Sequence, residues 1–284
     1  MLSDDILRVV DLDKENRGRK KWSRSIVVFL LLMMVSGFVL YLCWDKDVDF
    51  EAYKTEVGKT ATNSLGRLTL NEVIIDDNQI LLNATFEPVK EFAPDHQVFF
   101  FPQILVNGQD YMVRNGGQSI AKSAHVYTIY NSIKMDDFPS DEQLELVIRY
   151  KDWNVETPID KPWEFQIEAS QEQLQEDRQV FSIGKKIEHV DQQEITIDRV
   201  VSTPISTTIY FQSEKSIIND TLYFKIQSKA GQSWRFETPY PLNKERTKWG
   251  SRVDALYLTE GNYQLIPVDK EGQKVGSAIK IKED

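Results

Sequence analysis

Cysteine and histidine are scarce in this sequence of 284 residues. The single cysteine, Cys43, excludes an internal disulfide and a zinc site built from several cysteines. The three histidines, His96, His125 and His189, are dispersed and form no His-Glu-x-x-His motif, which argues against a histidine-based zinc site. We therefore expect neither a metal site nor a cofactor.

Motifs of catalysis are lacking as well. The sequence contains no Gly-x-Ser-x-Gly elbow and no glycine loop that could cradle a phosphate. Two acidic pairs, Asp76-Asp77 and Asp136-Asp137, could bind calcium in principle, but neither lies in a loop with alternating oxygen ligands and a central glycine. We expect these carboxylates to be solvated in turns, which aspartate favours. The expectation is a protein that is not an enzyme.

Basic charge is in deficit over most of the chain. The formal net charge is -10, and beyond residue 24 the chain has 27 lysines and arginines against 39 acidic residues. A nucleic-acid partner is therefore not expected, because phosphate binding needs an excess of basic residues.

One long apolar run is present, SIVVFLLLMMVSGFVLYLCW, from Ser25 to Trp44. A helix of this length spans roughly 30 Å, the thickness of the hydrocarbon core of a bilayer. Basic residues dominate before the run and acidic residues after it, so the positive-inside rule places the N-terminus in the cytoplasm. The sequence predicts a cytoplasmic tail at residues 1–24, a transmembrane helix at 25–44, and an extracytoplasmic remainder.

Two alternatives to this membrane anchor remain open. Small residues at Val35-Ser36-Gly37 offer a possible signal-peptide cleavage site, although the apolar run continues beyond it. Cys43 suggests a lipoprotein, but Leu42 precedes it where such signals have a small residue.

The N-terminal tail has apolar residues at helical spacing, Leu2, Ile6, Val9 and Val10. They could form a docking peptide for a cytoplasmic partner. The alternative is a frayed tail, because an isolated helix shorter than about 12 residues is marginal in water.

Alternating strand patterns dominate the rest of the chain, and the clearest are at residues 67–74, 80–88, 97–106, 109–115, 142–150, 161–167, 194–201 and 207–213. Asn107-Gly108 predicts a tight hairpin turn, and Asn115-Gly116-Gly117 predicts another turn.

One strand is spelled twice, as RLTLNEVI at Arg67–Ile74 and as EITIDRVV at Glu194–Val201. The offset of 127 residues between Val73 and Val200 is the length of a domain. The polar segment 166–179 separates the copies, so we predict domain 1 at 45–168, a linker at 169–179 and domain 2 at 180–284.

The second copy ends in a strand, an Asp-Lys-Glu-Gly turn and a final strand, which resembles the closing hairpin of immunoglobulin-like sandwiches. The predicted fold class is mainly β, with one N-terminal transmembrane helix followed by two tandem immunoglobulin-like β-sandwich domains. A barrel remains an alternative, because one sequence does not show strand pairing.

One cationic segment, NKERTKWGSR at Asn243–Arg252, stands out in the acidic C-terminal part. An aromatic face beside cations could bind a sugar or an anionic polymer, and the candidate ligand-binding residues are Lys244, Arg246, Lys248, Trp249 and Arg252. The alternative is a solvated loop whose tryptophan packs into the edge of the sandwich.

The apolar run followed by EVGKTATNSLGRLTLNEVIIDDNQILLNATFE, WEFQI and FSIGKKIEHVDQQEITIDRVVSTPISTTIYF resembles a family of single-pass Gram-positive membrane proteins. Their ectodomain has no known function and is often followed by a second immunoglobulin-like domain, and some relatives are anti-sigma factors. The resemblance covers residues 26 to 284 and brings no catalytic residues.

The resemblance implies a membrane-anchored extracytoplasmic binding protein, an envelope sensor or regulator of the anti-sigma-factor-like type. Its expected partners are the lipid bilayer, a cytoplasmic regulator or sigma factor, and a cell-wall polymer or peptide. The alternative function is a structural or cell-wall-binding surface protein without a regulatory role.

Overall fold

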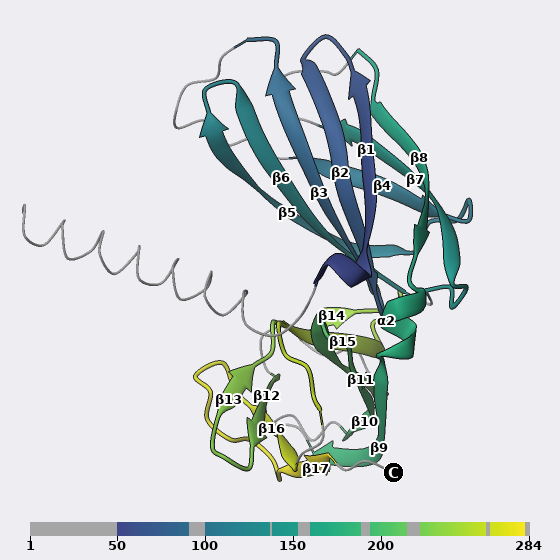
Figure 1. The fold of residues 1–284 in the computed structure, drawn as a ribbon. Helices are drawn as coiled ribbons and strands as arrows, with labels where there is room; N and C mark the ends of the chain where they lie inside the picture. The colour runs from purple at the N-terminus through teal and green to yellow at the C-terminus, as the bar shows by residue number, and fades with distance from the viewer. Residues whose placement is uncertain are drawn as a thin grey trace, which may run out of the picture. The chain divides into compact units, whose positions relative to one another are not determined.

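The computed structural model describes residues 50–90, 100–136, 138–152, 160–188, 194–214, 222–259 and 262–281. These residues are mainly β, and their strands form four antiparallel sheets that stack as two sandwich-like pairs (Figure 1). Asp49–Asp284 form one compact unit. The prediction of a mainly β chain is confirmed.

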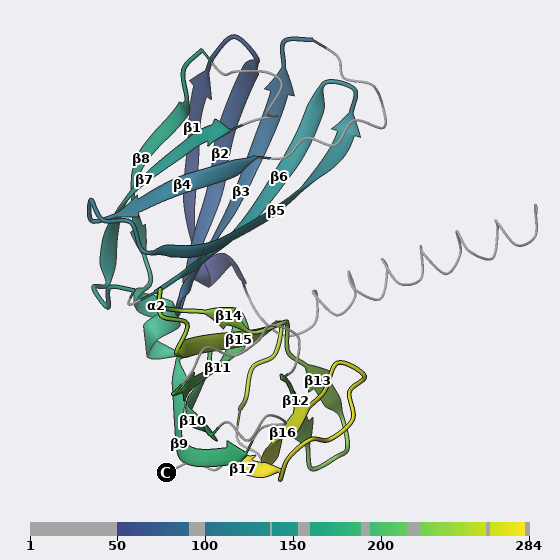
Figure 2. The same ribbon diagram turned by 180° about the vertical axis from the view of Figure 1, so that it is seen from behind.

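The first sheet pair, residues 54–170, combines a five-stranded and a three-stranded sheet. The five-stranded sheet has the order β1 (Lys54–Thr62), β2 (Gly66–Asp76), β3 (Gln79–Pro88), β6 (Val126–Met135) and β5 (Met112–Ser123). The three-stranded sheet has the order β4 (Phe101–Val106), β7 (Gln143–Asp152) and β8 (Trp163–Ser170). Figure 2 shows this second sheet lying across the first.

The second sheet pair, residues 179–281, combines a five-stranded and a four-stranded sheet. The first has the order β14 (Tyr240–Pro241), β15 (Lys248–Asp254), β11 (Ser206–Ser213), β10 (Glu194–Ser202) and β9 (Gln179–Glu188). The other has the order β13 (Ser233–Arg235), β12 (Tyr223–Ser228), β16 (Tyr263–Val268) and β17 (Ile279–Ile281).

The two sheet pairs repeat one strand order. The run β2-β3-β6-β5 corresponds to β10-β11-β15-β14, and β4-β7-β8 corresponds to β12-β16-β17. The twice-spelled strand therefore occupies the same position in both pairs, as β2 and as β10. The predicted boundaries of the two domains stay a prediction.

Both copies of this strand contain a β-bulge at the same place. The pairing register shifts between Leu70 and Glu72 in β2, and between Ile197 and Arg199 in β10. A bulge adds one residue to one strand, so the apolar positions before and after it stay on the same face of the sheet. The residues on either side of the bulge that belong to the two main cores are Leu68, Leu70, Val73 and Ile75 in β2, and Ile195, Ile197 and Val200 in β10.

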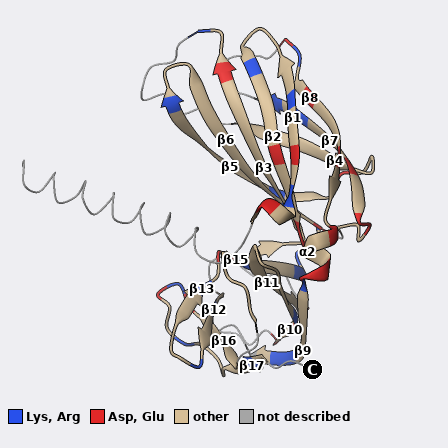
Figure 3. Cartoon of the chain, in the orientation of Figure 1, with Lys and Arg blue, Asp and Glu red and all other residues tan. Residues whose placement is uncertain are grey.

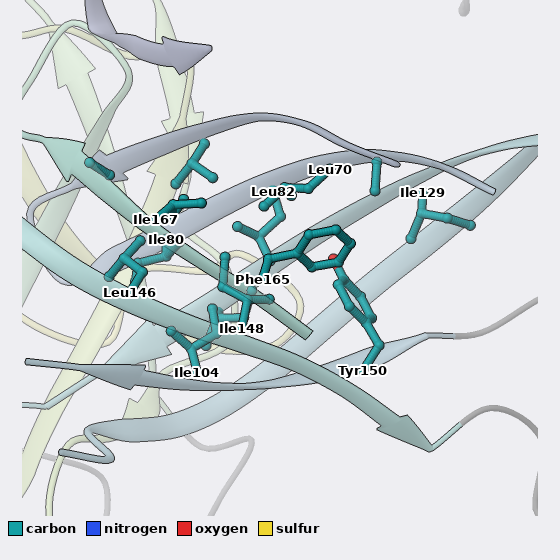
Figure 4. Close-up of a cluster of buried hydrophobic side chains, with 14 of the residues drawn as sticks. Leu70, Ile80, Leu82, Ile104, Ile129, Leu146, Ile148, Tyr150, Phe165 and Ile167 are labelled. Atoms are coloured by element: carbon teal, nitrogen blue, oxygen red, sulfur yellow. The ribbon is translucent and has the colours of Figure 1, made fainter. Parts of the chain in front are cut away.

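The core of the first sheet pair is mostly aliphatic, with Tyr150 and Phe165 among its leucines and isoleucines (Figure 4). Phe86, Phe100 and Trp163 meet edge to face, with ring centroids 4.9 to 5.6 Å apart. The Trp163 indole N–H donates to the backbone oxygen of Gly66 at 3.1 Å, so its polar atom is satisfied inside the core.

The second sheet pair has a separate core. Phe211 meets Phe224 edge to face at 5.1 Å and stacks on Trp249 at 6.4 Å between ring centroids. The cores of the two pairs form distinct clusters, so each pair buries its own apolar faces.

Two of the turns predicted from the sequence differ in the structure from their prediction. Asn107 and Gly108 have positive φ, as the tight turn requires, but β4 and β5 on either side belong to different sheets. Asn115-Gly116-Gly117 is no turn: it lies inside β5. A Cβ at Gly117 would lie 2.5 Å from Asn131 Nδ2, so the glycine is needed for the close approach of β6.

The structure does not support the predicted N-terminal transmembrane helix or the single-pass membrane localisation that depended on it. The helices of the described residues are η1 (Phe50–Tyr53) and α2 (Glu172–Glu176), and none is long and apolar enough to cross a membrane. A span needs about 20 residues. The fold class is corrected to mainly β. The expected tail and span at residues 1–44 lie outside the described residues, as do Leu2, Ile6, Val9 and Val10.

Candidate functional site

The predicted binding segment Asn243–Arg252 does not form one surface. Trp249 lies on β15 with 1% of its surface exposed, packed in the core against Phe211. The Arg252 side chain, three residues further on, is fully buried. Trp249 therefore has no open face for a sugar ring, and Arg252 is not available to an anionic polymer.

The remaining basic residues lie at the turn between β14 and β15. Asn243 Oδ1 accepts hydrogen bonds from the backbone N–H groups of Thr247 and Lys248, at 2.9 and 3.0 Å, which closes the turn. The Arg246 guanidinium lies 5.4 Å from the centre of the Trp249 ring. Lys244 and Lys248 are exposed. The turn is held by its own hydrogen bonds.

Arg252 instead forms a buried ion pair with Asp76, whose side chain is also fully buried. Asp76 ends β2 in the first sheet pair, and Arg252 lies on β15 in the second. The pair therefore joins the two sheet pairs. The expectation that Asp76 is solvated in a turn is wrong, because the turn after β2 packs against the second sheet pair.

Further hydrogen bonds satisfy the buried carboxylate of Asp76. Thr203 Oγ1 and Ser206 Oγ donate to it at 2.6 and 2.8 Å. Arg252 also donates through Nε to Asp254 at 2.9 Å. Such partners are needed because a buried charge has lost its bound water, and hydrogen bonds and counter-charges must replace that water. Burial opposes the charge on Arg252, but the carboxylates of Asp76 and Asp254 outweigh it and hold its pKa above the usual value.

The next two residues of the same turn also reach the second sheet pair. Asp77 has a positive φ of 51°, accepts a hydrogen bond from the Tyr210 hydroxyl, and pairs with Arg178 Nη2 at 3.1 Å. Burial raises the Asp77 pKa, against the opposing effect of Arg178. Asn78 Nδ2 donates to the Tyr240 hydroxyl at 3.1 Å.

A cavity of about 320 Å³ lies beside these contacts, and we call it the junction cleft. It is lined by both sheet pairs and by the segment that connects them. Its charged and hydrogen-bonding lining residues include Asp77, Asn78, Asp136, Gln171, Gln175, Arg178, Asp198, Arg199, Thr203, Tyr210, Gln212, Lys248 and Trp249. Lys248 and Trp249 are the predicted ligand-binding residues found in this lining, while Lys244, Arg246 and Arg252 are outside it.

The connecting segment forms one wall of the cleft. It was predicted as a polar linker, and it contains α2, whose Leu174 is buried with 3% of its surface exposed. Gln171 Nε2 donates to the backbone oxygens of Pro139 and Asp141, at 2.9 and 2.7 Å. These bonds fix the start of α2 against the loop before β7.

Charge in the lining is mixed in sign. Among the described strands, basic and acidic segments are interspersed, and the short α2 carries acidic residues (Figure 3). Within the described residues no group of three or more His, Cys, Asp or Glu side chains is arranged to hold a metal ion. The cleft offers hydrogen-bonding groups and charges of both signs for binding.

Sequence patterns did not reveal the junction cleft. Asp76 and Asp77 were expected to be solvated in a turn, but the residues that meet them and Asn78 are more than 100 positions away. The repeat held a partial signal: Thr203 occupies in the second copy the position of Asp76 in the first, and the two side chains meet.

Comparisons with known proteins show the fold and leave the activity open. No protein-family model matches the chain, and no curated protein matches it. A solved structure described as the conserved domain protein from Bacillus anthracis is similar, with a TM-score of 0.61 at 12% sequence identity. The match covers 77% of this chain and 78% of that one. At this identity the likeness concerns the fold alone.

Proposed function

We propose that the protein is a non-enzymatic binding protein that takes a small polar ligand in the junction cleft. The observation that carries the proposal is the cleft itself, a cavity of about 320 Å³ lined by residues of both sheet pairs. Ligand pockets have volumes of about 300 to 1,000 Å³ and favour boundaries between structural units. A regulatory role fits this placement, because a ligand there contacts the residues that join the sheet pairs.

The lining suits binding better than turnover. Acid–base and nucleophilic catalysis need a reactive side chain beside a partner that tunes it. Among the described lining residues there is neither histidine nor cysteine, and the Asp77 carboxylate is committed to Arg178 and Tyr210.

We infer that both sheet pairs are immunoglobulin-like. In the constant-type immunoglobulin sandwich one sheet has strands A, B, E and D in order, and the other has C, F and G. The order β2-β3-β6-β5 with β4-β7-β8 matches this arrangement, and so does β10-β11-β15-β14 with β12-β16-β17. Strands β1 and β9 are additions beside the first strand of each, and β13 is an addition beside β12.

The test is a ligand-observed NMR screen of small polar compounds against the full chain. Ser140 is exposed and lines the cleft, so Ser140→Trp should fill it and abolish the signals of bound compounds. Gln118→Trp, at an exposed position of β5 outside the lining, is the matched control and should leave the signals unchanged. A screen without hits, or hits that survive Ser140→Trp, would overturn the proposal.

A structural role without a ligand is the second candidate, and the buried Asp76–Arg252 pair favours it. In that case the junction holds the two sheet pairs together and the cleft contains only water. The same screen separates the two functions.

A further inference from the structure

We propose that the ligand of the junction cleft carries a carboxylate next to an N–H group, as an amino acid or the C-terminus of a short peptide does. This inference rests on the proposed function and names the chemistry of the ligand. Three features of the lining carry it: two cations without a carboxylate partner, a buried donor without an acceptor, and a buried acceptor without a donor.

The two cations are Arg199 and Lys248. Neither forms an ion pair with a described carboxylate, whereas Arg178 in the same lining is paired with Asp77. The Arg199 guanidinium lies 4.2 Å from the centre of the Tyr210 ring, which holds its plane in place. A guanidinium positioned in this way can donate two parallel hydrogen bonds to a carboxylate.

Asp198 is the acidic neighbour that bears on this assignment. It also lines the cleft, and its carboxylate accepts a hydrogen bond from Gln212 Nε2 at 3.0 Å. It forms no ion pair with either cation, but its charge attracts both Arg199 and Lys248, so it tempers their charge without occupying their donors. It can also favour the positive end of a zwitterion.

The two unpartnered atoms are Trp249 Nε1 and Asn78 Oδ1. Both residues line the cleft, with 1% and 5% of their surfaces exposed, and neither atom has a hydrogen-bond partner in the protein. A buried polar atom left without a partner destabilises the folded protein, so each such atom needs an explanation, and a bound molecule is one. Neither atom is exposed to solvent, so a ligand in the cleft reaches them only after a small shift of the lining side chains. Trp249 then offers an N–H to an oxygen, and Asn78 offers an oxygen to an N–H.

Together these groups define one ligand chemistry. Arg199 and Lys248 favour an anion, Trp249 adds a neutral donor, and Asn78 requires a donor on the ligand. A carboxylate beside an amine or amide supplies all of these complements within a few bonds. The volume of about 320 Å³ is at the small end for ligand pockets and fits a compound of this size.

The experiment is calorimetric titration of the full chain with a matched set of probes. N-acetyl-L-alanine has both groups, N-acetyl-L-alanine amide lacks the carboxylate, and propionate lacks the N–H. L-alanine and L-alanyl-L-alanine distinguish a free amino acid from a peptide C-terminus as the source of the carboxylate. We expect one of the three probes with both groups to bind at least about tenfold more tightly than the amide and propionate.

Three variants locate the binding. Arg199→Gln should weaken the best probe at least about tenfold and remove the preference for acid over amide. Trp249→Phe keeps an aromatic ring against Phe211 and removes the N–H, and it should weaken the same probe severalfold. Lys244→Gln, an exposed residue of the neighbouring turn outside the lining, is the control and should change nothing. Thermal melts verify that each variant is folded.

The outcomes separate this inference from the proposed function. If the amide or propionate binds as tightly as the full probes, or if folded Arg199→Gln binds unchanged, the inference is wrong. If no probe binds while the NMR screen of small polar compounds gives hits that Ser140→Trp abolishes, the inference is wrong and the proposed function is supported. If neither the calorimetric titration nor the NMR screen detects binding, the inference and the proposed function are both wrong.

Discussion

Asp76 and Arg252, separated by 176 positions in the sequence, form an ion pair in which neither side chain has any exposed surface. The pair connects the end of β2 to β15, and it places the turn after β2 beside the junction cleft. The stability of the contact between the two sheet pairs therefore depends on two charges that must stay together.

Removal of one member of this pair is expected to destabilise the fold strongly. Arg252→Met leaves the Asp76 carboxylate buried without its counter-charge, which costs about 3 to 5 kcal/mol. Urea unfolding followed by fluorescence measures the free energy of unfolding. The double variant Asp76→Leu with Arg252→Met should lose less than the sum of the single losses.

The matched control is the exposed pair Arg149–Glu164, whose atoms are 2.6 Å apart. Arg149→Gln should cost far less than Arg252→Met, because water screens an exposed pair. Equal losses at the exposed and buried pairs would contradict the assignment of Asp76 and Arg252 to the interior.

Trp249 is expected to stabilise the folded protein through its packing in the core. Trp249→Ala removes a core ring stacked on Phe211, and such truncations cost about 3 to 5 kcal/mol. Lys244→Gln in the adjoining turn should stay within about 0.5 kcal/mol, since Lys244 is exposed. A Trp249→Ala protein with wild-type stability in thermal and urea unfolding would show that Trp249 does not lie in the core.

Alkaline pH is expected to stabilise the protein up to about pH 10. Burial and the charge of Arg252 lower the Lys134 pKa from 10.5 to about 8, against the opposing effect of Glu237. Between pH 8 and 10.5 the unfolded chain holds this proton more tightly than the folded chain, so the free energy of unfolding rises with pH. Burial raises the pKa of Tyr240, whose stabilising contribution is present below about pH 10 and is lost above it.

Urea unfolding between pH 7 and 11 measures this profile. Lys134→Gln can still donate to Gln79 and carries no titrating charge, so its profile should be flat from pH 8 to 10. A rise that persists in Lys134→Gln would assign the effect to another group.

Two glycines provide a test of the close approach between strands. A Cβ at Gly66 would lie 2.4 Å from the backbone oxygen of Glu87, and one at Gly116 would lie 3.7 Å from the nearest atom, the backbone oxygen of Ser132. Gly66→Ala should therefore lower the melting temperature by several degrees, because β2 and β3 must separate. Gly116→Ala should melt close to wild type, and the reverse order would show that the register of β2 is misplaced.

The sequence predicted strands well wherever one face of a sheet is buried. The alternation in β2 and β10 was visible because apolar side chains recur at every second residue up to the bulge. Turn chemistry was less reliable: Asn115-Gly116-Gly117 has the composition of a turn, yet it lies inside β5, where Gly117 allows the approach of Asn131 from β6. Local composition did not indicate that use.

The junction cleft could not be predicted from the sequence. Its key side chains come from the turn after β2, from α2 and from β10, β11 and β15, and only the tertiary fold brings them together. Trp249 and Lys248 were selected for their chemistry and do line the cleft, but Arg252 was selected as a surface cation and is buried against Asp76. A charge in a polar sequence context gave no sign of its burial.

The most direct test of the account is a crystal structure of the protein soaked with N-acetyl-L-alanine. The account predicts the ligand in the junction cleft, with its carboxylate within hydrogen-bonding distance of Arg199 and its amide N–H facing Asn78. A cleft that contains only water at saturating ligand, or a ligand bound elsewhere, would contradict it.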